Sequence, residues 1–311
     1  MSGLVTKAIS GFFTVQTDQG AVVAQLPGRL KQEWQTTSIV AVGDQVSISV
    51  NRDGSGTIET IAERRSVLSR TRPSAENRRL LSDQEQVLVA NPDQLIFVFA
   101  TQNPATNLRK LDRFLVVAEV NELTAVICVN KIDLVGLNVA RRQFKLYQDI
   151  GYRVIYTSAV TGEGVAELRD CLHDKLSVLT GSSGVGKSSL LNAIEPGLGL
   201  KVRDVSQTTG KGLHTTRYAE LFPLAGGGYL ADTPGIRGLA LYDLEPWELD
   251  AYFREIAPLV EACQFSDCSH RHEPNCAVRT AVEDGRISPE RYDSYLRLRE
   301  EHEMLDKSAY E

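Results

Sequence analysis

The stretch GSSGVGKS at residues 181–188 decides the fold of this chain, because it matches the pattern G-x-x-x-x-G-K-[ST] between an apolar run at 176–180 and a helical pattern. Glycines at this spacing let consecutive backbone N–H groups converge on phosphates, while Lys187 supplies positive charge at the β and γ oxygens and Ser188 a magnesium ligand. We therefore predict a phosphate-binding loop with the candidate residues Gly181, Ser182, Ser183, Gly184, Val185, Gly186, Lys187, Ser188 and Ser189.

Strands and helices alternate on the N-terminal side of this loop. Runs typical of buried strands occur at 94–101, 123–129, 153–156 and 176–180. Helical patterns lie at 110–120, 138–150 and 165–175. This alternation predicts an α/β fold with a mostly parallel sheet that helices cover on both faces. Ligands bind such sheets at the carboxyl ends of the strands, so the residues that follow each strand are candidates for a site.

A second motif, Asn130-Lys131-Ile132-Asp133, comes directly after the strand at 123–129. The carboxylate of Asp133 can accept both N–H groups of a guanine edge, whereas adenine presents the opposite pattern and would leave it unpaired. Together with the phosphate loop, the motif predicts a guanine nucleotide; the alternative is a helix entry that Asp133 caps. A weaker match to the loop whose backbone N–H contacts guanine O6 follows the next strand, with Ser158 and Ala159 as candidates.

The segment Asp232-Thr233-Pro234-Gly235 follows another short apolar strand and fits the element D-x-x-G. In that element, Asp232 reaches magnesium through water and the Gly235 N–H meets the γ-phosphate. The alternative is a simple Pro-Gly turn.

A polar segment at 205–217 contains His214-Thr215-Thr216. A threonine there can close over the magnesium ion when the γ-phosphate is present, which would make the segment a switch ordered by nucleotide. We favour Thr216 as the magnesium ligand, and Thr215 stays open as the alternative.

The regions outside the sheet suggest further parts. Residues 1–65 alternate apolar and polar residues in short runs between turn signals, which predicts an OB-type β-barrel; the alternative is a β-rich extension of the next domain. Residues 66–86 are rich in arginine and poor in apolar residues, which predicts a linker. The expected organisation is a barrel over 1–65, a linker over 66–86, a nucleotide-binding domain over 87–245 and a helical domain over 246–311.

Four potential metal ligands lie close together near the C-terminus, at Cys263, Cys268, His270 and Cys276. Thiolate sulfurs and an imidazole suit a tetrahedral zinc ion with a closed shell, so we predict one structural Zn²⁺ that activates no water. The alternatives are buried thiols with an incidental histidine, and His272 in place of His270.

Composition and charge exclude several classes of protein. With 42% hydrophobic and 24% charged residues among 311, the chain is neither disordered nor fibrous. No apolar run approaches the roughly 20 residues of a membrane span, and no secretory signal is evident, so we expect a cytoplasmic protein without membrane contact. The formal net charge of −6 arises mainly at 246–311, with eight basic and fifteen acidic residues, and does not exclude nucleic-acid contact elsewhere.

The order of these motifs is circularly permuted. Ordinary GTPases begin with the phosphate loop, whereas here N-K-x-D at 130–133 precedes the loop at 181–188. With a barrel in front and a Cys/His cluster behind, the whole chain resembles the bacterial ribosome small-subunit-dependent GTPase A family. The resemblance implies that a P-loop GTPase domain hydrolyses GTP to GDP and phosphate. It also implies stimulation by the small ribosomal subunit, contact with rRNA and a role in late subunit maturation; a monomer is the default.

Catalysis departs from the common GTPase pattern. Ile236 follows Gly235, where many GTPases have a glutamine that orients the attacking water, and an aliphatic side chain cannot hydrogen-bond to water. His214 is the nearest substitute, and the resemblance also points to a histidine just before the switch threonines. We expect His214, Lys187 and Thr216 to be catalytic, and hydrolysis by the isolated protein to be slow.

Two other classes of function stay open at this point. One is an RNA-binding assembly factor in which GTP is a fixed structural ligand. The other is a P-loop kinase or ATPase that acts on a small molecule, against which the motif at 130–133 argues.

Overall fold

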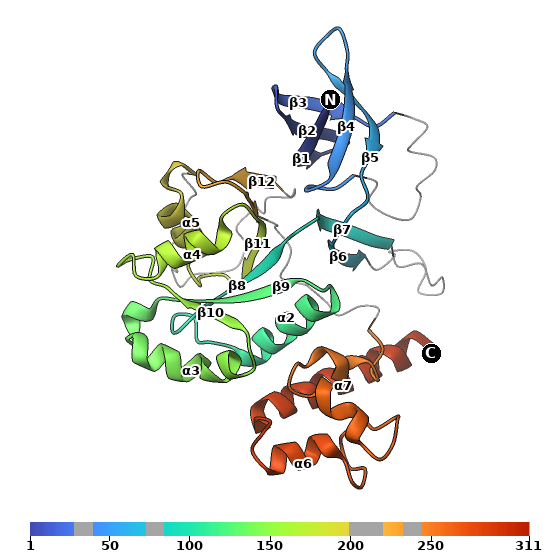
Figure 1. The fold of residues 1–311 in the computed structure, drawn as a ribbon, viewed down its shortest axis with the longest axis vertical. Helices are drawn as coiled ribbons and strands as arrows, with labels where there is room; N and C mark the ends of the chain where they lie inside the picture. The colour runs from blue at the N-terminus through green and yellow to red at the C-terminus, as the bar shows by residue number, and fades with distance from the viewer. Residues whose placement is uncertain (28–39, 73–83, 199–219, 233–243, 311) are drawn as a thin grey trace.

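The computed structural model describes residues 1–27, 40–72, 84–198, 220–232 and 244–310. In Figure 1 a β-barrel at the top is followed by an α/β layer structure in the middle and a helical region at the bottom. Within the described residues, no helix is long and apolar enough to cross a membrane.

The barrel consists of five strands: β1 (Ser2–Ile9), β2 (Phe12–Thr17), β3 (Gly20–Gln25), β4 (Gln45–Val50) and β5 (Gly56–Ile61). Their order is β1-β2-β3-β5-β4, and an additional pairing between β1 and β4 closes the sheet on itself. Alternate residues such as Val5, Val15 and Ile58 are fully buried in its centre, as expected of a period-two strand pattern. The predicted OB-type barrel is confirmed.

The segment at 66–86 differs from the linker that the sequence predicts. Strands β6 (Val67–Arg72) and β7 (Gln84–Ala90) pair antiparallel across it. Leu68 and Val89 are completely buried and belong to the main core. Apolar residues are few here, but the hairpin contributes to two core clusters, Leu68 and Val89 to the main one and Val87 to a smaller one with Ala41 and Ala90. The composition alone does not reveal this burial.

The barrel is joined closely to the rest of the chain. Ala90 donates its backbone N–H to the carbonyl of Val42 at 2.8 Å. At Gly43 (φ +95°) a Cβ would lie 2.0 Å from the carbonyl oxygen of Ala90, so this close approach requires glycine. Strand β1 also pairs with an edge strand of the central sheet, with Lys7 opposite Glu220 and their charged groups 2.9 Å apart.

The central sheet has the strand order β10-β9-β8-β11-β13-β12, and all neighbouring pairs except β12–β13 are parallel. Its strands are β8 (Gln94–Ala100), β9 (Thr124–Asn130), β10 (Arg153–Tyr156), β11 (Leu176–Gly181), β12 (Glu220–Pro223) and β13 (Tyr229–Asp232). Its helices are α2 (Leu108–Val120), α3 (Leu137–Asp149), α4 (Val165–Leu172) and α5 (Lys187–Ile194).

Both faces of this sheet are covered, which confirms the α/β fold class. Every residue of β8 is buried: Leu95 and Phe97 belong to the core cluster that includes residues of α2 and α3, and Ile96 and Val98 to the cluster that includes residues of α4 and α5. Such double burial explains why the strands read as continuous apolar runs.

The start of α2 and the end of α4 differ from the sequence prediction. Helix α2 begins at Leu108, before the expected 110, because the side chain of Asn107 caps it by accepting the Lys110 N–H at 3.0 Å. Helix α4 ends at Leu172, before the expected 175, because His173 and Asp174 leave the helical conformation.

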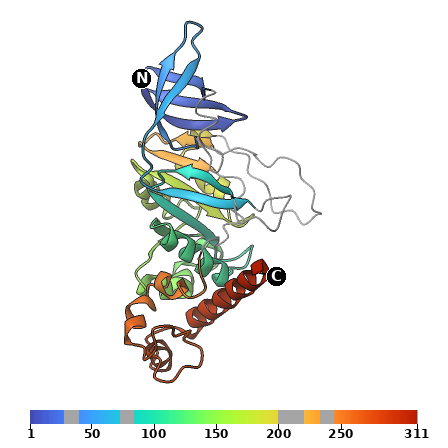
Figure 2. The same ribbon diagram turned by 90° about the vertical axis from the view of Figure 1, so that its right-hand side faces the viewer.

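The C-terminal region packs under α2 and contains η4 (Leu249–Tyr252), η5 (Ala257–Ala262), α6 (Ala277–Glu283) and α7 (Pro289–Tyr310). Figure 2 shows α7 as a long helix at the end of the molecule opposite the barrel. The proline at its first turn is where the sequence predicts it, although the helix continues beyond the expected Leu305.

Candidate functional site

The phosphate-loop motif connects β11 to α5 at the carboxyl end of the parallel sheet. From β8 the sheet extends to β9 and β10 on one side and to β11 and β13 on the other, so the strand order reverses between β8 and β11. The phosphate loop follows β11 and therefore lies at a topological switch point. At Gly181 (φ +156°) a Cβ would lie 2.3 Å from the carbonyl oxygen of Val98, and at Gly186 (φ +94°) 2.4 Å from Nδ2 of Asn130. Both positions therefore require glycine.

Lysine and serine side chains of the motif cluster at the start of α5. The Nζ of Lys187 donates to the carbonyl oxygens of Gly181 at 2.8 Å and Ser182 at 2.9 Å, inside its own loop. Ser188 and Ser189 are half-buried in the first turn of the helix, while Ser183 is exposed. The positive end of the helix dipole and a lysine thus meet at one loop, which suits an anionic ligand.

The guanine motif contacts this loop directly. Nδ2 of Asn130, which is 1% exposed, donates to the carbonyl of Val185 at 2.9 Å. Nζ of Lys131 donates to the carbonyl of Gly184 at 2.7 Å and also to that of Asn103. The two sequence motifs, separated by about 50 positions, therefore form one site at the ends of β9 and β11.

The loop after β10 contacts the predicted guanine motif. The backbone N–H of Ala159 donates to Oδ1 of Asn130 at 3.3 Å, and the hydroxyl of the buried Ser158 donates to Oδ1 of the exposed Asp133 at 2.6 Å. The sequence motif predicts only a backbone contact in this loop, so the role of the Ser158 hydroxyl is not predicted. The signal that could have predicted this contact is a serine two residues after β10, because β10 pairs with β9, the strand that leads into N-K-x-D.

Several candidate residues lie outside the described part of the chain: His214, Thr215, Thr216, Gly235 and Ile236. Asp232 ends β13, whose residue Ala231 is paired with Val178 of β11. The backbone of Asp232 therefore lies at the end of the strand next to β11, which leads into the phosphate loop.

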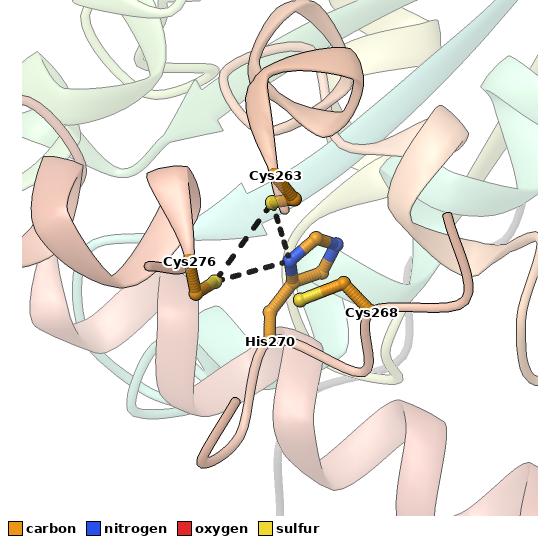
Figure 3. Close-up of side chains that lie close together, drawn as sticks. All are labelled: Cys263, Cys268, His270 and Cys276. Atoms are coloured by element: carbon orange, nitrogen blue, oxygen red, sulfur yellow. Dashed lines mark hydrogen bonds between the residues drawn. The ribbon is translucent and has the colours of Figure 1, made fainter. Parts of the chain in front are cut away.

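The four predicted metal ligands converge in the C-terminal region (Figure 3). One donor atom from each of Cys263, Cys268, His270 and Cys276 lies within 4.8 Å of the others. Nδ1 of His270 lies 3.6 Å from the sulfur of Cys263 and 3.4 Å from that of Cys276, and these two sulfurs are 4.0 Å apart. Ligand atoms around tetrahedral zinc are separated by about 3.5–3.8 Å, so the donor set fits this ion. His272, the alternative ligand, is exposed.

A buried carboxylate that the sequence analysis misses orients this histidine. Oδ2 of Asp250, on η4, lies 3.1 Å from Nε2 of His270, and both side chains are almost inaccessible to solvent. The contact leaves Nδ1 directed at the cysteines. Such outer carboxylates fix the tautomer of a metal-binding histidine.

Other residues hold the backbone of the ligand loop. The Glu273 carboxylate accepts the N–H groups of Ser269 at 2.8 Å and Arg271 at 3.0 Å. Burial raises the pKa of this carboxyl, but hydrogen bonds from the Ser269 hydroxyl and from backbone N–H groups, including those of Ser269 and His272, outweigh it and hold the pKa below the ordinary value. Tyr292 of α7 donates its hydroxyl to the carbonyl of His270. The loop is therefore held in place by its surroundings as well as by its cysteines.

A parallel sheet with a phosphate loop after β11 and N-K-x-D after β9, in this chain order, defines a circularly permuted P-loop GTPase. The family model described as RsgA GTPase matches residues 61–242, and the model described as RsgA N-terminal domain matches residues 2–58. The chain belongs to the RsgA GTPase family and is accordingly a GTP hydrolase.

Named relatives agree with this assignment over almost the full length. A protein of Gemmatimonas aurantiaca named small ribosomal subunit biogenesis GTPase RsgA is 45% identical over 303 residues, covering 96% of this chain and 97% of the relative. The crystal structure of YjeQ from Thermotoga maritima is 37% identical, covers 97% of this chain and 98% of its own, and has a TM-score of 0.78. The crystal structure of YloQ, described as a circularly permuted GTPase, is 32% identical with a TM-score of 0.75, over 97% of this chain and 94% of its own.

Proposed function

We propose that this protein acts in the biogenesis of the small ribosomal subunit in the cytoplasm, binding the subunit and its rRNA and hydrolysing GTP during late maturation. The observation that carries the proposal is the contact of Asn130 and Lys131 with the phosphate loop, because it joins a guanine-selecting motif to a phosphate-binding motif. Relatives of nearly equal length are named small ribosomal subunit biogenesis GTPases.

In the proposed complex, each side of the nucleotide meets a different motif. Asp133 accepts the guanine N–H groups, and the hydroxyl of Ser158 keeps its carboxylate in place. The Nζ of Lys187 gives up its hydrogen bonds to the loop carbonyls and donates to phosphate oxygens instead. The hydroxyl of Ser188 faces the metal. Bound Mg²⁺ would neutralise charge on the β- and γ-phosphates.

Catalysis in this proposal depends on the two segments that follow the loop in the chain. Thr216, or Thr215 in its place, supplies a second hydroxyl for magnesium, while Asp232 supports the ion through water and Gly235 meets the γ-phosphate. Ile236 replaces the usual glutamine, and His214 orients the attacking water. Because His214 has to be positioned by closure of its segment, hydrolysis is slow until the small subunit favours the closed form.

The cysteine and histidine cluster has a structural role in this proposal. Cys263, Cys268, His270 and Cys276 would hold one Zn²⁺, which supplies a cross-link between the turns of the C-terminal region. All four positions of a tetrahedral ion are then occupied by protein, so this region presents a surface and performs no chemistry.

The decisive experiment measures GTP hydrolysis by the isolated protein and after addition of purified small ribosomal subunits. We expect at least about a tenfold increase in turnover, with no increase on addition of large subunits and no competition by ATP. His214→Ala should bind GTP normally and lose the stimulated turnover, while the exposed His272→Ala should behave as wild type. Equal turnover with and without subunits would favour an assembly factor that holds GTP as a fixed ligand.

A further inference from the structure

Helix α2 begins with two basic side chains in its first turn, Arg109 and Lys110, and no acidic residue. This placement is unfavourable in isolation, because the N-terminal end of a helix dipole is positive and repels cations. Arg109 is compensated by Asp293 of α7 at 3.4 Å. For Lys110, the described residues provide no carboxylate within ion-pair distance.

Lys110 is directed at the phosphate loop. Its Nζ donates to the hydroxyl of Ser182 at 3.1 Å and lies 5.4 Å from the centre of the Phe114 ring. The cap made by Asn107 fixes the start of the helix at this turn, and therefore the direction of the lysine. A basic residue in the first turn of a helix, beside a loop with a phosphate-binding pattern, breaks a local rule, which is expected at functional sites.

Three lysines hold the loop, in two different ways. Lys187 and Lys131 donate to backbone carbonyls of the loop, whereas Lys110 donates to a side-chain hydroxyl. In the proposed complex Lys187 must leave its carbonyls to reach the phosphate oxygens. Lys110 has no such exchange to make, so it can keep Ser182 in place before and after the nucleotide binds.

We propose that Lys110 is a positioning residue of the nucleotide site. It holds the first half of the phosphate loop through Ser182 and adds positive charge on the side of the loop that faces α2. The inference rests on the proposed nucleotide binding at 181–188 and adds a residue from outside the motifs. Its effect concerns the phosphates, so it applies to GTP and GDP alike and leaves the guanine contacts unchanged.

The test compares Lys110→Met with Lys145→Met, which makes the same charge change at an exposed lysine of α3 that pairs with Asp149. Titration calorimetry measures the dissociation constants of GDP, a non-hydrolysable GTP analogue and guanosine at two salt concentrations. For Lys110→Met we expect GDP and GTP-analogue binding to weaken about three- to tenfold and to depend less on salt. Guanosine, which has no phosphate, should bind within about twofold of wild type. Lys110→Arg should recover most of the loss.

The same contact can be tested from the loop side. Ser182→Ala should weaken GDP binding by less than Lys110→Met, because the charge remains, and the two changes should be less than additive in the double variant. Additive effects, or GDP binding by Lys110→Met equal to that of Lys145→Met, would overturn the inference. An equal loss for guanosine would also overturn it, since Lys110 would then support the fold in general. Failure of the proposed function has another signature, the absence of guanine-nucleotide binding by the wild-type protein.

Discussion

The candidate nucleotide site and the candidate zinc site are built in opposite ways. The first joins residues about 50 positions apart through the parallel sheet, and its motifs meet through side chains that donate to loop carbonyls. The second takes all four ligands from 263–276, but its orientation depends on Asp250 and Tyr292 from other elements. A permuted chain order preserves the first site, because the pairing of strands in the sheet, and not their order in the sequence, determines which loops lie side by side.

A helix of the GTPase layer connects the two regions. Near its start α2 contacts the phosphate loop through Lys110, and two residues later Asp112 accepts from Nη1 of Arg291 of α7 at 2.7 Å. Arg291 is 1% exposed, pairs also with Glu255 at 2.6 Å, and lies 4.5 Å from the ring of Phe253. Burial lowers the pKa of Arg291, but the two carboxylates outweigh it and raise the pKa above the ordinary value. The joint between the regions is therefore a buried charge network.

Arg291→Met should have the largest effect, because it removes the cation and leaves the buried Asp112 and the half-buried Glu255 without it. We expect the free energy of unfolding of the C-terminal region to fall by about 3–5 kcal/mol, measured by calorimetry. GDP affinity at low temperature should stay within about threefold of wild type, since the loop contacts of Asn130 and Lys131 remain.

The control for this prediction is Arg297→Met, on the exposed face of the same helix, where the arginine pairs with Asp293 at 2.8 Å. It should change stability by less than about 1 kcal/mol. Loss of GDP binding in Arg291→Met at a temperature where the GTPase layer is folded would show that the two regions are not separable.

Asp133→Asn should have the next largest effect and is confined to the nucleotide site. An amide has one acceptor oxygen, and its NH₂ group replaces the second one, so it cannot accept both guanine N–H groups side by side; we expect GDP affinity to fall at least about a hundredfold. Xanthosine diphosphate, which has a carbonyl at C2, should bind this variant better than GDP does. The exposed Asp149→Asn is the matched control, and equal GDP affinity in both variants would contradict the assignment of Asp133.

The sequence predicts the local features of both sites and misses their supports. Asn130 and Gly181 are predicted because motif spacing and strand ends specify them, and the ligand set from Cys263 to Cys276 because short spacing limits the geometry. Lys110 and Asp250 belong to no motif: their roles come from tertiary contacts with Ser182 and His270 that no local pattern encodes. The hairpin of β6 and β7 is missed for the same reason, because β7 crosses the expected boundary at residue 86 and its buried residue Val89 lies beyond it.

Asp250→Asn tests how far the zinc site depends on its surroundings. An amide at this position removes the charge next to Nε2 of His270, and where its NH₂ group faces Nε2 it favours a proton on Nδ1, the nitrogen directed at the cysteines. We expect zinc affinity to fall about 10- to 100-fold in competition with a chromogenic chelator. Asp267→Asn is the control, an exposed carboxylate next to the ligand Cys268. Equal zinc affinities in the two variants would mean that the local ligands suffice.

The smallest expected effect concerns the start of the C-terminal region. His302 of α7 is 6% exposed, and its Nδ1 lies 3.1 Å from the carbonyl of Leu244. Burial lowers the pKa of His302 by desolvating the imidazolium, although the Leu244 carbonyl favours the protonated form. The unfolded chain takes up this proton near pH 6.5, whereas the folded chain does so at lower pH. The stabilising contribution is therefore complete above pH 6.5 and decreases as the pH falls toward the lowered value.

We expect this loss of stability to be confined to the C-terminal region. Between about pH 7 and pH 5 the unfolding free energy should fall by less than about 1.4 kcal/mol per pH unit, the limit for one proton. His302→Gln should remove this component of the pH dependence, and His272→Gln, at an exposed position, should keep it. Hydrogen exchange should show the loss near Leu244 and α7, with the phosphate loop unchanged. Loss of protection at the phosphate loop over the same pH range would mean that α2 transmits the change, and the nucleotide site would then share its stability with the C-terminal region.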